Sequence, residues 1–258
     1  MPAARESLLD AAYTALTAQA WAAVRMVDVA AAAGVSRQTL YNEFGSKEGL
    51  ARALVHRETA NYLAGVEKAL TRDGRQAAAG PPGDAAGRVV AAATWTLRAA
   101  RTNPLVRAAL TGCWSERLPA PPTTAAVRAV RRGVPAQRSR ARAEDPLPGP
   151  AELVGRFCDR AVAALEPDWP REELPALGTA CETAARLTLS CVVAPVVPGS
   201  ALAAGAPPVT DRVPAGSAGA GAAQTRPEPE AETVSRLVRG AFARLPGGEG
   251  WPADGPRV

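Results

Sequence analysis

The stretch VDVAAAAGVSRQTLYNEFGSKEGL, residues Val27 to Leu50, is a run of helix-forming residues that Gly34 interrupts. Glycine is common just past a helix end, because it adopts positive φ without strain. Ser36, two residues later, is a preferred helix N-cap. We therefore expect a short helix over about 27–33, a tight turn at Gly34 and a second helix over 37–44.

The second helix has two chemically different faces. Leu40 and Phe44 are spaced i, i+4, which places both on the side that faces a core. The polar residues of the helix include Arg37, Gln38, Thr39, Tyr41 and Asn42. A helix, a tight turn and a capped polar helix are typical of a helix-turn-helix, whose second helix enters the major groove of DNA. In that groove Gln and Asn pair with adenine, Arg pairs with guanine, and Thr offers a methyl group to thymine.

Two residues near the end of this stretch are suited to the DNA backbone rather than to base edges. Lys47 opens the next helix, which Ser46 caps, and the N-terminal end of a helix favours phosphate. Tyr41 carries a hydroxyl on the exposed face of its helix. We expect Tyr41 and Lys47 to contact phosphates.

These residues resemble the TetR family of bacterial repressors. The resemblance rests on the Gly34-Val35-Ser36 turn, Thr39-Leu40-Tyr41, Phe44 and the Ser46-Lys47-Glu48 helix start, with the first helix LLDAAYTAL before them. It covers about the first quarter of the chain. It implies a three-helix DNA-binding head, a helical body that binds ligand and dimerises, and release of DNA when a small molecule binds.

The sequence departs from the family pattern at two positions before the turn. Arg25 stands where the family usually has a threonine that caps the short helix, and we expect its guanidinium to reach a phosphate instead. Ala20 replaces the usual glycine after the first helix. The candidate DNA-binding residues are Arg25, Ser36, Arg37, Gln38, Thr39, Tyr41, Asn42 and Lys47.

Composition favours an all-α protein. Of the 258 residues, 47% are hydrophobic and only 4% aromatic, so the core must be built from Ala, Leu and Val, which suits closely packed helices. The formal net charge of +5 is weak support for nucleic-acid binding, because residues 1–57 hold six cations against five anions. The motif, and not the charge, carries the DNA-binding prediction.

The chain divides into four predicted parts. Residues 1–50 form the helix-turn-helix head, and residues 51–194 form the effector-binding and dimerisation body. Residues 195–230 contain seven prolines and five glycines, which predicts a disordered linker. Residues 231–245 form a last amphipathic helix that docks back on the body. The further helices are expected at about 5–19, 47–70, 85–101, 104–116, 151–165 and 174–193.

An arginine-rich segment, residues 127–142, has six arginines and no acidic residue. A solvated loop is the simpler interpretation, because Gly133 and Pro135 argue against one continuous basic helix. An auxiliary arm that contacts phosphates is the functional alternative.

The body contains candidates for a ligand cavity and for a dimer interface. Trp95, Trp114 and Phe157 are bulky apolar residues that fit a hydrophobic pocket between helices, although core packing accounts for each one singly. Segments 152–165 and 180–196 carry apolar faces for a four-helix dimer interface or for the intrachain core. The body segments NPLVRAALTG and RLTLSCVVAP resemble actinobacterial TetR members linked to lipid or alkane metabolism.

Other function classes find little support in the sequence. The four cysteines lack metal-binding spacing, and with one histidine they predict buried reduced thiols rather than a zinc site. No catalytic constellation, cofactor motif, secretory leader or membrane-length apolar run is apparent, so we expect a cytoplasmic protein that is not an enzyme. The function expected is a dimeric repressor that binds operator DNA and is released by a small apolar effector. A helical DNA-binding dimer without effector control is the alternative.

Overall fold

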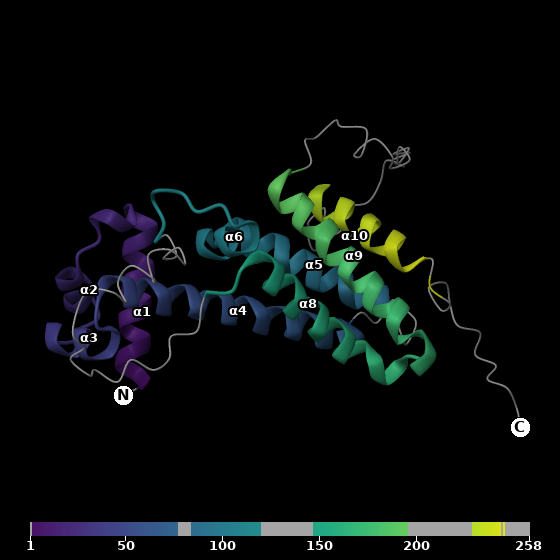
Figure 1. The fold of residues 1–258 in the computed structure, drawn as a ribbon, viewed down its shortest axis with the longest axis horizontal. Helices are drawn as coiled ribbons and strands as arrows, with labels where there is room; N and C mark the ends of the chain where they lie inside the picture. Colours follow the sequence, from purple (N-terminus) through teal and green to yellow (C-terminus); the bar gives the residue numbers. More distant parts are fainter. Residues whose placement is uncertain (1, 77–83, 120–146, 196–228, 244, 246–258) are drawn as a thin grey trace, which may run out of the picture. The chain divides into compact units, whose positions relative to one another are not determined.

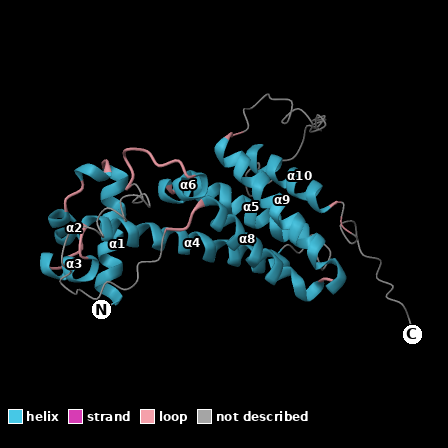
Figure 2. Cartoon of the chain, viewed as in Figure 1, coloured by secondary structure: helices cyan, strands magenta, loops and turns pink. Residues whose placement is uncertain are grey.

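The computed structural model describes residues 2–76, 84–119, 147–195, 229–243 and 245. Helices and the loops between them account for all of these residues, and no strand occurs among them (Figure 2). The all-α prediction is confirmed. The arginine-rich segment 127–142 and nearly all of the predicted linker 195–230 lie outside the described residues.

The helices follow one another in the order that Figure 1 labels. They are α1 (Pro2–Ala18), η1 (Trp21–Ala23), α2 (Met26–Ala32), α3 (Arg37–Phe44), α4 (Lys47–Gln76), α5 (Ala85–Thr102), α6 (Pro104–Thr111), α8 (Pro150–Leu165), η2 (Glu166–Asp168), η3 (Arg171–Glu173), α9 (Leu174–Val193) and α10 (Pro229–Phe242).

The chain forms two compact units. The first unit comprises Met1–Ala64 and Ala99–Leu153, and the second comprises Gly65–Arg98 and Val154–Val258. The predicted end of the head at residue 50 falls inside α4, which continues as one helix to Gln76.

In the first unit, α1, α2 and α3 pack on one another around an aliphatic core. The fully buried leucines of this core come from α1, α3, α4 and α6, and are Leu8, Leu9, Leu40, Leu50, Leu54 and Leu105. Aromatic residues are few in it, as the composition predicts. Trp21 of η1 closes the cluster beside α1 and is 8% exposed. Small alanines between the leucines let the short helices approach closely.

The turn between α2 and α3 has the geometry that its glycine predicts. Gly34 has φ of 66°, and its N–H donates to the carbonyl of Ala31 at 3.1 Å. The N–H of Val35 reaches back to the carbonyl of Ala30 at 3.0 Å. These two bonds are those of a Schellman motif, which satisfies the last carbonyls of α2 and ends the helix.

Two predicted helix ends were wrong. We expected the fourth helix to end near Leu70, but α4 continues through Gly74 to Gln76. We expected the helix that begins at Pro104 to reach Glu116, but α6 ends at Thr111 because Gly112 takes φ of 71° and donates to the carbonyl of Ala108.

The prediction that all four cysteines are buried was wrong for one of them. Cys113 follows the turn at Gly112 and is exposed, whereas Cys181 and Cys191 are buried and Cys158 is half-buried. All four are free thiols. Burial raises the pKa of Cys158 to about 11 and that of Cys181 to about 12, so both remain protonated thiols at neutral pH.

In the second unit, α10 packs against α9 and buries Val234, Val238 and Phe242. Arg88 of α5 links two other helices of this unit, because its guanidinium donates to the carbonyls of Leu70 in α4 and Ala164 in α8. Ala164 lies in the last turn of α8, where the helix itself supplies fewer donors for the carbonyls.

A close approach of α4 to α5 within the second unit makes a testable requirement for glycine. The indole of Trp95 occupies the space that a Cβ at Gly65 would need. Gly65→Ala must displace this indole, and we expect it to destabilise the fold by about 1–3 kcal/mol. Urea unfolding of the full chain measures the change.

Gly155→Ala is the matched control for this prediction. Gly155 is an exposed helical glycine of α8 whose added Cβ would meet open space. Alanine there should stabilise the chain by about 0.5–1 kcal/mol through helix propensity. Equal effects of the two substitutions would show that the indole of Trp95 does not pack on Gly65.

Candidate nucleic-acid interface

Helix α3 is short, capped and half-buried. The Ser36 hydroxyl accepts a hydrogen bond from the backbone N–H of Thr39 at 3.0 Å, which is the expected N-cap interaction. Leu40 is fully buried and Phe44 is 9% exposed, so one side of α3 belongs to the core. This cap and this burial fix the orientation of the opposite side.

The opposite side of α3 presents a row of exposed polar groups. They come from Arg37, Gln38, Tyr41 and Asn42. The Arg37 guanidinium lies over the Tyr41 ring, 5.4 Å from its centroid. The Nε2 of Gln38 donates to the Oδ1 of Asn42 at 2.8 Å. Four of the residues that the sequence assigns to base reading or backbone contact are thus gathered on one surface.

Thr39 lies at the edge of this surface and is half-buried. Its hydroxyl is 2.8 Å from the hydroxyl of Ser36, so the two side chains share a hydrogen bond at the start of α3. The γ-methyl of Thr39 is the part of the side chain that makes no hydrogen bond. The residue therefore has an apolar group to offer at this surface.

Lys47 is held by the first unit in a way that the sequence did not reveal. Its ammonium donates to the carbonyl of Ala22 at 3.0 Å and lies 5.6 Å from the centre of the Trp21 ring. The start of α4 is capped as expected, because the Ser46 hydroxyl accepts from the N–H of Gly49 at 3.1 Å. Lys47 thus ties η1 to the first turn of α4, and its phosphate contact stays a prediction.

Arg25 occupies the N-cap position of α2 but makes no side-chain cap bond there. Its guanidinium instead forms a two-bond ion pair with Asp28, at 2.7 Å and 3.0 Å. The hydrogen bonds and the charge of Asp28 raise the pKa of Arg25. The Arg25 side chain is 73% exposed, so this pair remains accessible from solvent.

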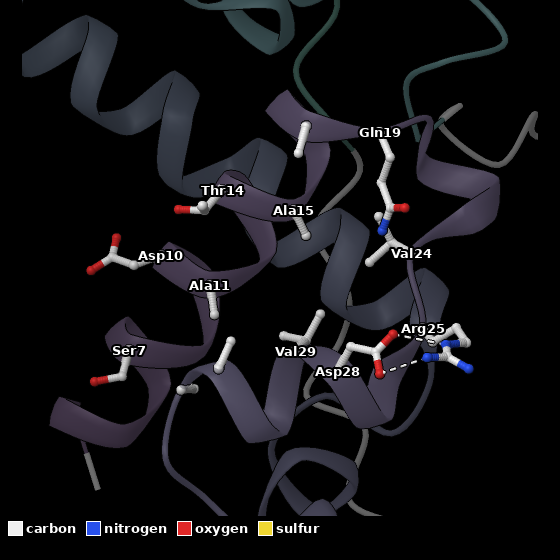
Figure 3. A pocket seen from close by; sticks show the side chains of 13 residues that line it. Ser7, Asp10, Ala11, Thr14, Ala15, Gln19, Val24, Arg25, Asp28 and Val29 are labelled. Atoms are coloured by element: carbon white, nitrogen blue, oxygen red, sulfur yellow. Dashed lines mark hydrogen bonds and ion pairs between the residues drawn. The ribbon is translucent and has the colours of Figure 1, made fainter.

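A surface hollow of about 590 Å³ lies between α1 and α2 in the first unit (Figure 3). Its lining is mostly alanine and short polar side chains, with the Arg25–Asp28 pair at one side. Of the candidate DNA-binding residues, only Arg25 lines it. The hollow is therefore separate from the polar row on α3.

A partly buried polar network links three helices of the first unit. Arg57 of α4 donates to Asp10 of α1 at 2.7 Å and pairs with Glu58 at 2.8 Å. Glu58 also accepts from the side-chain amide of Asn103 at 2.7 Å. Asn103 in turn caps α6 by accepting from the N–H of Leu105 at 3.0 Å. The network joins α1, α4 and α6.

Burial would disfavour the charge of Arg57, but Glu58, and then Asp10, more than offset that effect and raise the pKa of Arg57. Sequence reasoning missed this network. Arg57, Asp10 and Asn103 lie far apart in the chain, and no motif links them. Only the helix packing brings them together.

The three candidate ligand-binding residues fall into different units. Trp95 and Phe157 belong to the second unit, where Trp95 packs on Gly65 and Phe157 is 3% exposed. Trp114 belongs to the first unit and packs against the core of α1–α4. Its position favours a structural role for Trp114.

In the part of the chain that the structure describes, no group of three or more His, Cys, Asp or Glu side chains is arranged to hold a metal ion. None of the helices in those same ranges is long and apolar enough to cross a membrane.

Comparison with protein families and curated sequences shows what the chain is similar to. Residues 8–54 match the family model of bacterial regulatory proteins, tetR family. The HTH-type transcriptional regulator AlkX of Mycobacterium tuberculosis strain H37Rv is 56% identical over 48 residues, which is 19% of this chain and 23% of AlkX. An uncharacterised HTH-type transcriptional regulator of the same strain is 37% identical over 107 residues, which is 41% of this chain and 48% of the relative. The chain thus matches less than half the length of each relative.

Solved structures of the same family also resemble the chain. The TetR family repressor AlkX from Dietzia sp. strain DQ12-45-1b, implicated in biodegradation of n-alkanes, is 26% identical and has a TM-score of 0.42. The match covers 74% of this chain and 84% of that one. A tetR-family transcriptional regulator from Streptomyces coelicolor is 15% identical with a TM-score of 0.45, covering 94% of this chain and 80% of that one.

The N-cap of α3 can be tested by its effect on stability. Ser36→Ala removes the acceptor for the N–H of Thr39 and should lower the free energy of unfolding by about 1 kcal/mol, within a range of about 0.5–2. Ser7→Ala, on the exposed surface of α1, is the control and should be close to neutral. Thermal unfolding followed by circular dichroism compares them. A Ser36→Ala protein as stable as the Ser7→Ala protein would contradict the cap.

Proposed function

Because residues 8–54 place this chain in the TetR family of bacterial regulatory proteins, we propose that it is a transcriptional repressor whose α3 enters the major groove of operator DNA. The observation that carries this proposal is the polar row on α3, which stands opposite the buried Leu40 and Phe44. A helix anchored by one face and polar on the other is what major-groove reading requires.

The residues of this surface divide between two kinds of contact. Arg37, Gln38 and Asn42 carry the donors and acceptors that read base edges, and the methyl group of Thr39 suits thymine. Tyr41 of α3, Lys47 at the start of α4 and Arg25 at the N-cap of α2 position the head on phosphates. Ser36 acts through the cap that orients α3.

Residues 1–57, which contain the helix-turn-helix, are not strongly basic, with six cations against five anions, and this limits the affinity of one copy for DNA. Arg25, Arg57 and Arg5 each form an ion pair with a carboxylate within the first unit. A phosphate must therefore compete with Asp28 for Arg25. We propose that the affinity comes from two heads of a homodimer, which bind half-sites about 34 Å apart on one face of the duplex.

The dimer contact is proposed for α8 and α9. Several apolar residues of the two segments predicted for this contact are already buried within a single chain, among them Phe157, Ala184 and Cys191. Val154 and Leu187 are only half-buried, and Val193 is 62% exposed. These three leave apolar surface for a second copy.

We propose that a small apolar effector binds in the second unit beside Trp95 and Phe157 and releases the DNA. The Dietzia AlkX repressor is implicated in biodegradation of n-alkanes, and we propose an effector of that apolar class here. The protein would act in the cytoplasm, without a cofactor. A DNA-binding dimer that has no effector remains the alternative.

DNA binding is tested through the only two lysines of the chain. Lys47→Ala should weaken binding to specific and random duplexes alike, and should reduce the slope of log affinity against log salt by about one. Base preference should not change. Fluorescence anisotropy at several salt concentrations measures both quantities.

Lys68→Ala removes the same charge from an exposed position of α4 in the second unit and is the control. It should leave the affinity and the salt slope unaltered. The phosphate role of Lys47 is wrong if both variants behave like the wild type. The DNA-binding proposal itself fails if the wild type prefers no sequence over random duplex.

Effector control is tested by titrating n-alkanes of increasing length while following tryptophan fluorescence, with and without operator. The coupling must be reciprocal, so operator should weaken alkane binding by the same factor by which the alkane weakens operator binding, typically about 5- to 150-fold. Trp95→Phe should abolish much of the fluorescence response. A bound alkane that leaves operator affinity unchanged would support the alternative without effector control.

A further inference from the structure

The two side-chain amides on the exposed face of α3 are joined to each other. Gln38 and Asn42 are spaced i, i+4, so one stands directly above the other on the helix surface. Both are exposed, and the Nε2 of Gln38 donates to the Oδ1 of Asn42 at 2.8 Å. Neither amide is therefore oriented independently of its neighbour.

We propose that Gln38 and Asn42 act as one bonded reading element that recognises a single A·T pair in each operator half-site. This inference rests on the proposed DNA-binding function and adds to it the base pair that the two residues select. It differs from the simpler expectation of two separate readers, each of which contacts its own base.

The bond between the two amides leaves several of their donors and acceptors available for a base pair. An amide oxygen has two lone pairs and an amide nitrogen has two hydrogens. After the Gln38–Asn42 bond, both lone pairs on Oε1 of Gln38, one Nε2 hydrogen of Gln38, one lone pair on Oδ1 of Asn42 and both Nδ2 hydrogens of Asn42 remain. Along the bonded pair these groups alternate as acceptor, donor, acceptor, donor, and the last three give the order donor, acceptor, donor.

An A·T pair presents the complementary order in the major groove. Its edge offers the adenine N7 acceptor, the adenine N6 donor and the thymine O4 acceptor. A G·C pair offers two neighbouring acceptors, N7 and O6 of guanine, and then the N4 donor of cytosine. Donors and acceptors must alternate along a bonded amide chain, so the pair matches A·T and leaves a mismatch on G·C.

Either joint orientation of the two amides presents the same order of donors and acceptors. If both amides turn over together, Asn42 donates to Gln38, and the Nε2 of Gln38, its Oε1 and the Nδ2 of Asn42 again give donor, acceptor, donor. If only one amide turns, two NH₂ groups or two oxygens face each other and the bond is lost. The two joint orientations therefore select the same base pair.

This arrangement predicts that either residue fails without the other. Removing Gln38 frees the Asn42 amide to rotate, and removing Asn42 leaves Gln38 without the group that aligns it. Each single variant should lose discrimination at the same base pair. The double variant should lose no more than the worse single variant, because contacts made as one unit are strongly non-additive.

The test begins by selecting an operator sequence from a randomised duplex library with the full wild-type chain. Competition binding then measures duplexes in which each A·T pair is replaced in turn by G·C or by inosine·cytosine. Inosine·cytosine presents the acceptors of G·C in the major groove but keeps the minor-groove edge of A·T. It therefore separates the two grooves.

The proteins compared are the wild type, Gln38→Ala, Asn42→Ala, the double variant and Gln19→Ala. Gln19 is an exposed glutamine that follows α1 and lines the hollow in Figure 3, so it serves as the matched control. Thermal unfolding of each variant confirms that the fold is retained, which separates loss of reading from loss of structure.

At one A·T pair of the half-site, the wild type and Gln19→Ala should bind both replacements about 5- to 150-fold more weakly, the range of a good bidentate contact. Both single variants and the double variant should lose that preference together. Losses at different base pairs, multiplicative losses in the double variant, or full tolerance of inosine·cytosine would overturn the inference while leaving DNA binding intact. If the wild type enriched no sequence, both this inference and the proposed function would fall.

Discussion

The burial of Leu40 and Phe44 is the constraint on which the candidate interface depends. Helix α3 has eight residues, and a helix of that length has little stability alone in water. The cap at Ser36 and the two buried side chains supply what the short helix lacks. Because these groups fix the rotation of α3, they also determine that Gln38, Tyr41 and Asn42 face solvent as one surface.

The charged groups of the first unit serve structure before they serve binding. Arg57 is enclosed by carboxylates of α1 and α4, Lys47 holds the carbonyl of Ala22, and Arg25 is paired with Asp28. These charges therefore stabilise the fold of the head. On a strongly basic surface, the same charges would be available to contact DNA phosphates. On the proposed function, affinity comes from two heads, and the neutral amides of Gln38 and Asn42 add specificity without long-range attraction.

The sequence predicted the helix-turn-helix closely because its determinants are local: Gly34 for the turn, Ser36 for the cap and the i, i+4 spacing of Leu40 and Phe44. It missed what depends on packing between distant segments. The Arg57–Glu58–Asn103 network, the bond from Lys47 to η1 and the position of Trp114 against the first-unit core all have partners remote in the chain. The end of α6 was also missed, although Gly112 was a local signal for it.

Dimethyl sulfate protection of operator DNA tests the central claim, that α3 lies in the major groove, most directly. The reagent methylates guanine at N7 in the major groove and adenine at N3 in the minor groove. With the full chain bound, we expect N7 protection in two patches about one helical turn apart, with adenine N3 remaining reactive between and within them. Protection of adenine N3 while guanine N7 stays reactive throughout the bound site would contradict this claim.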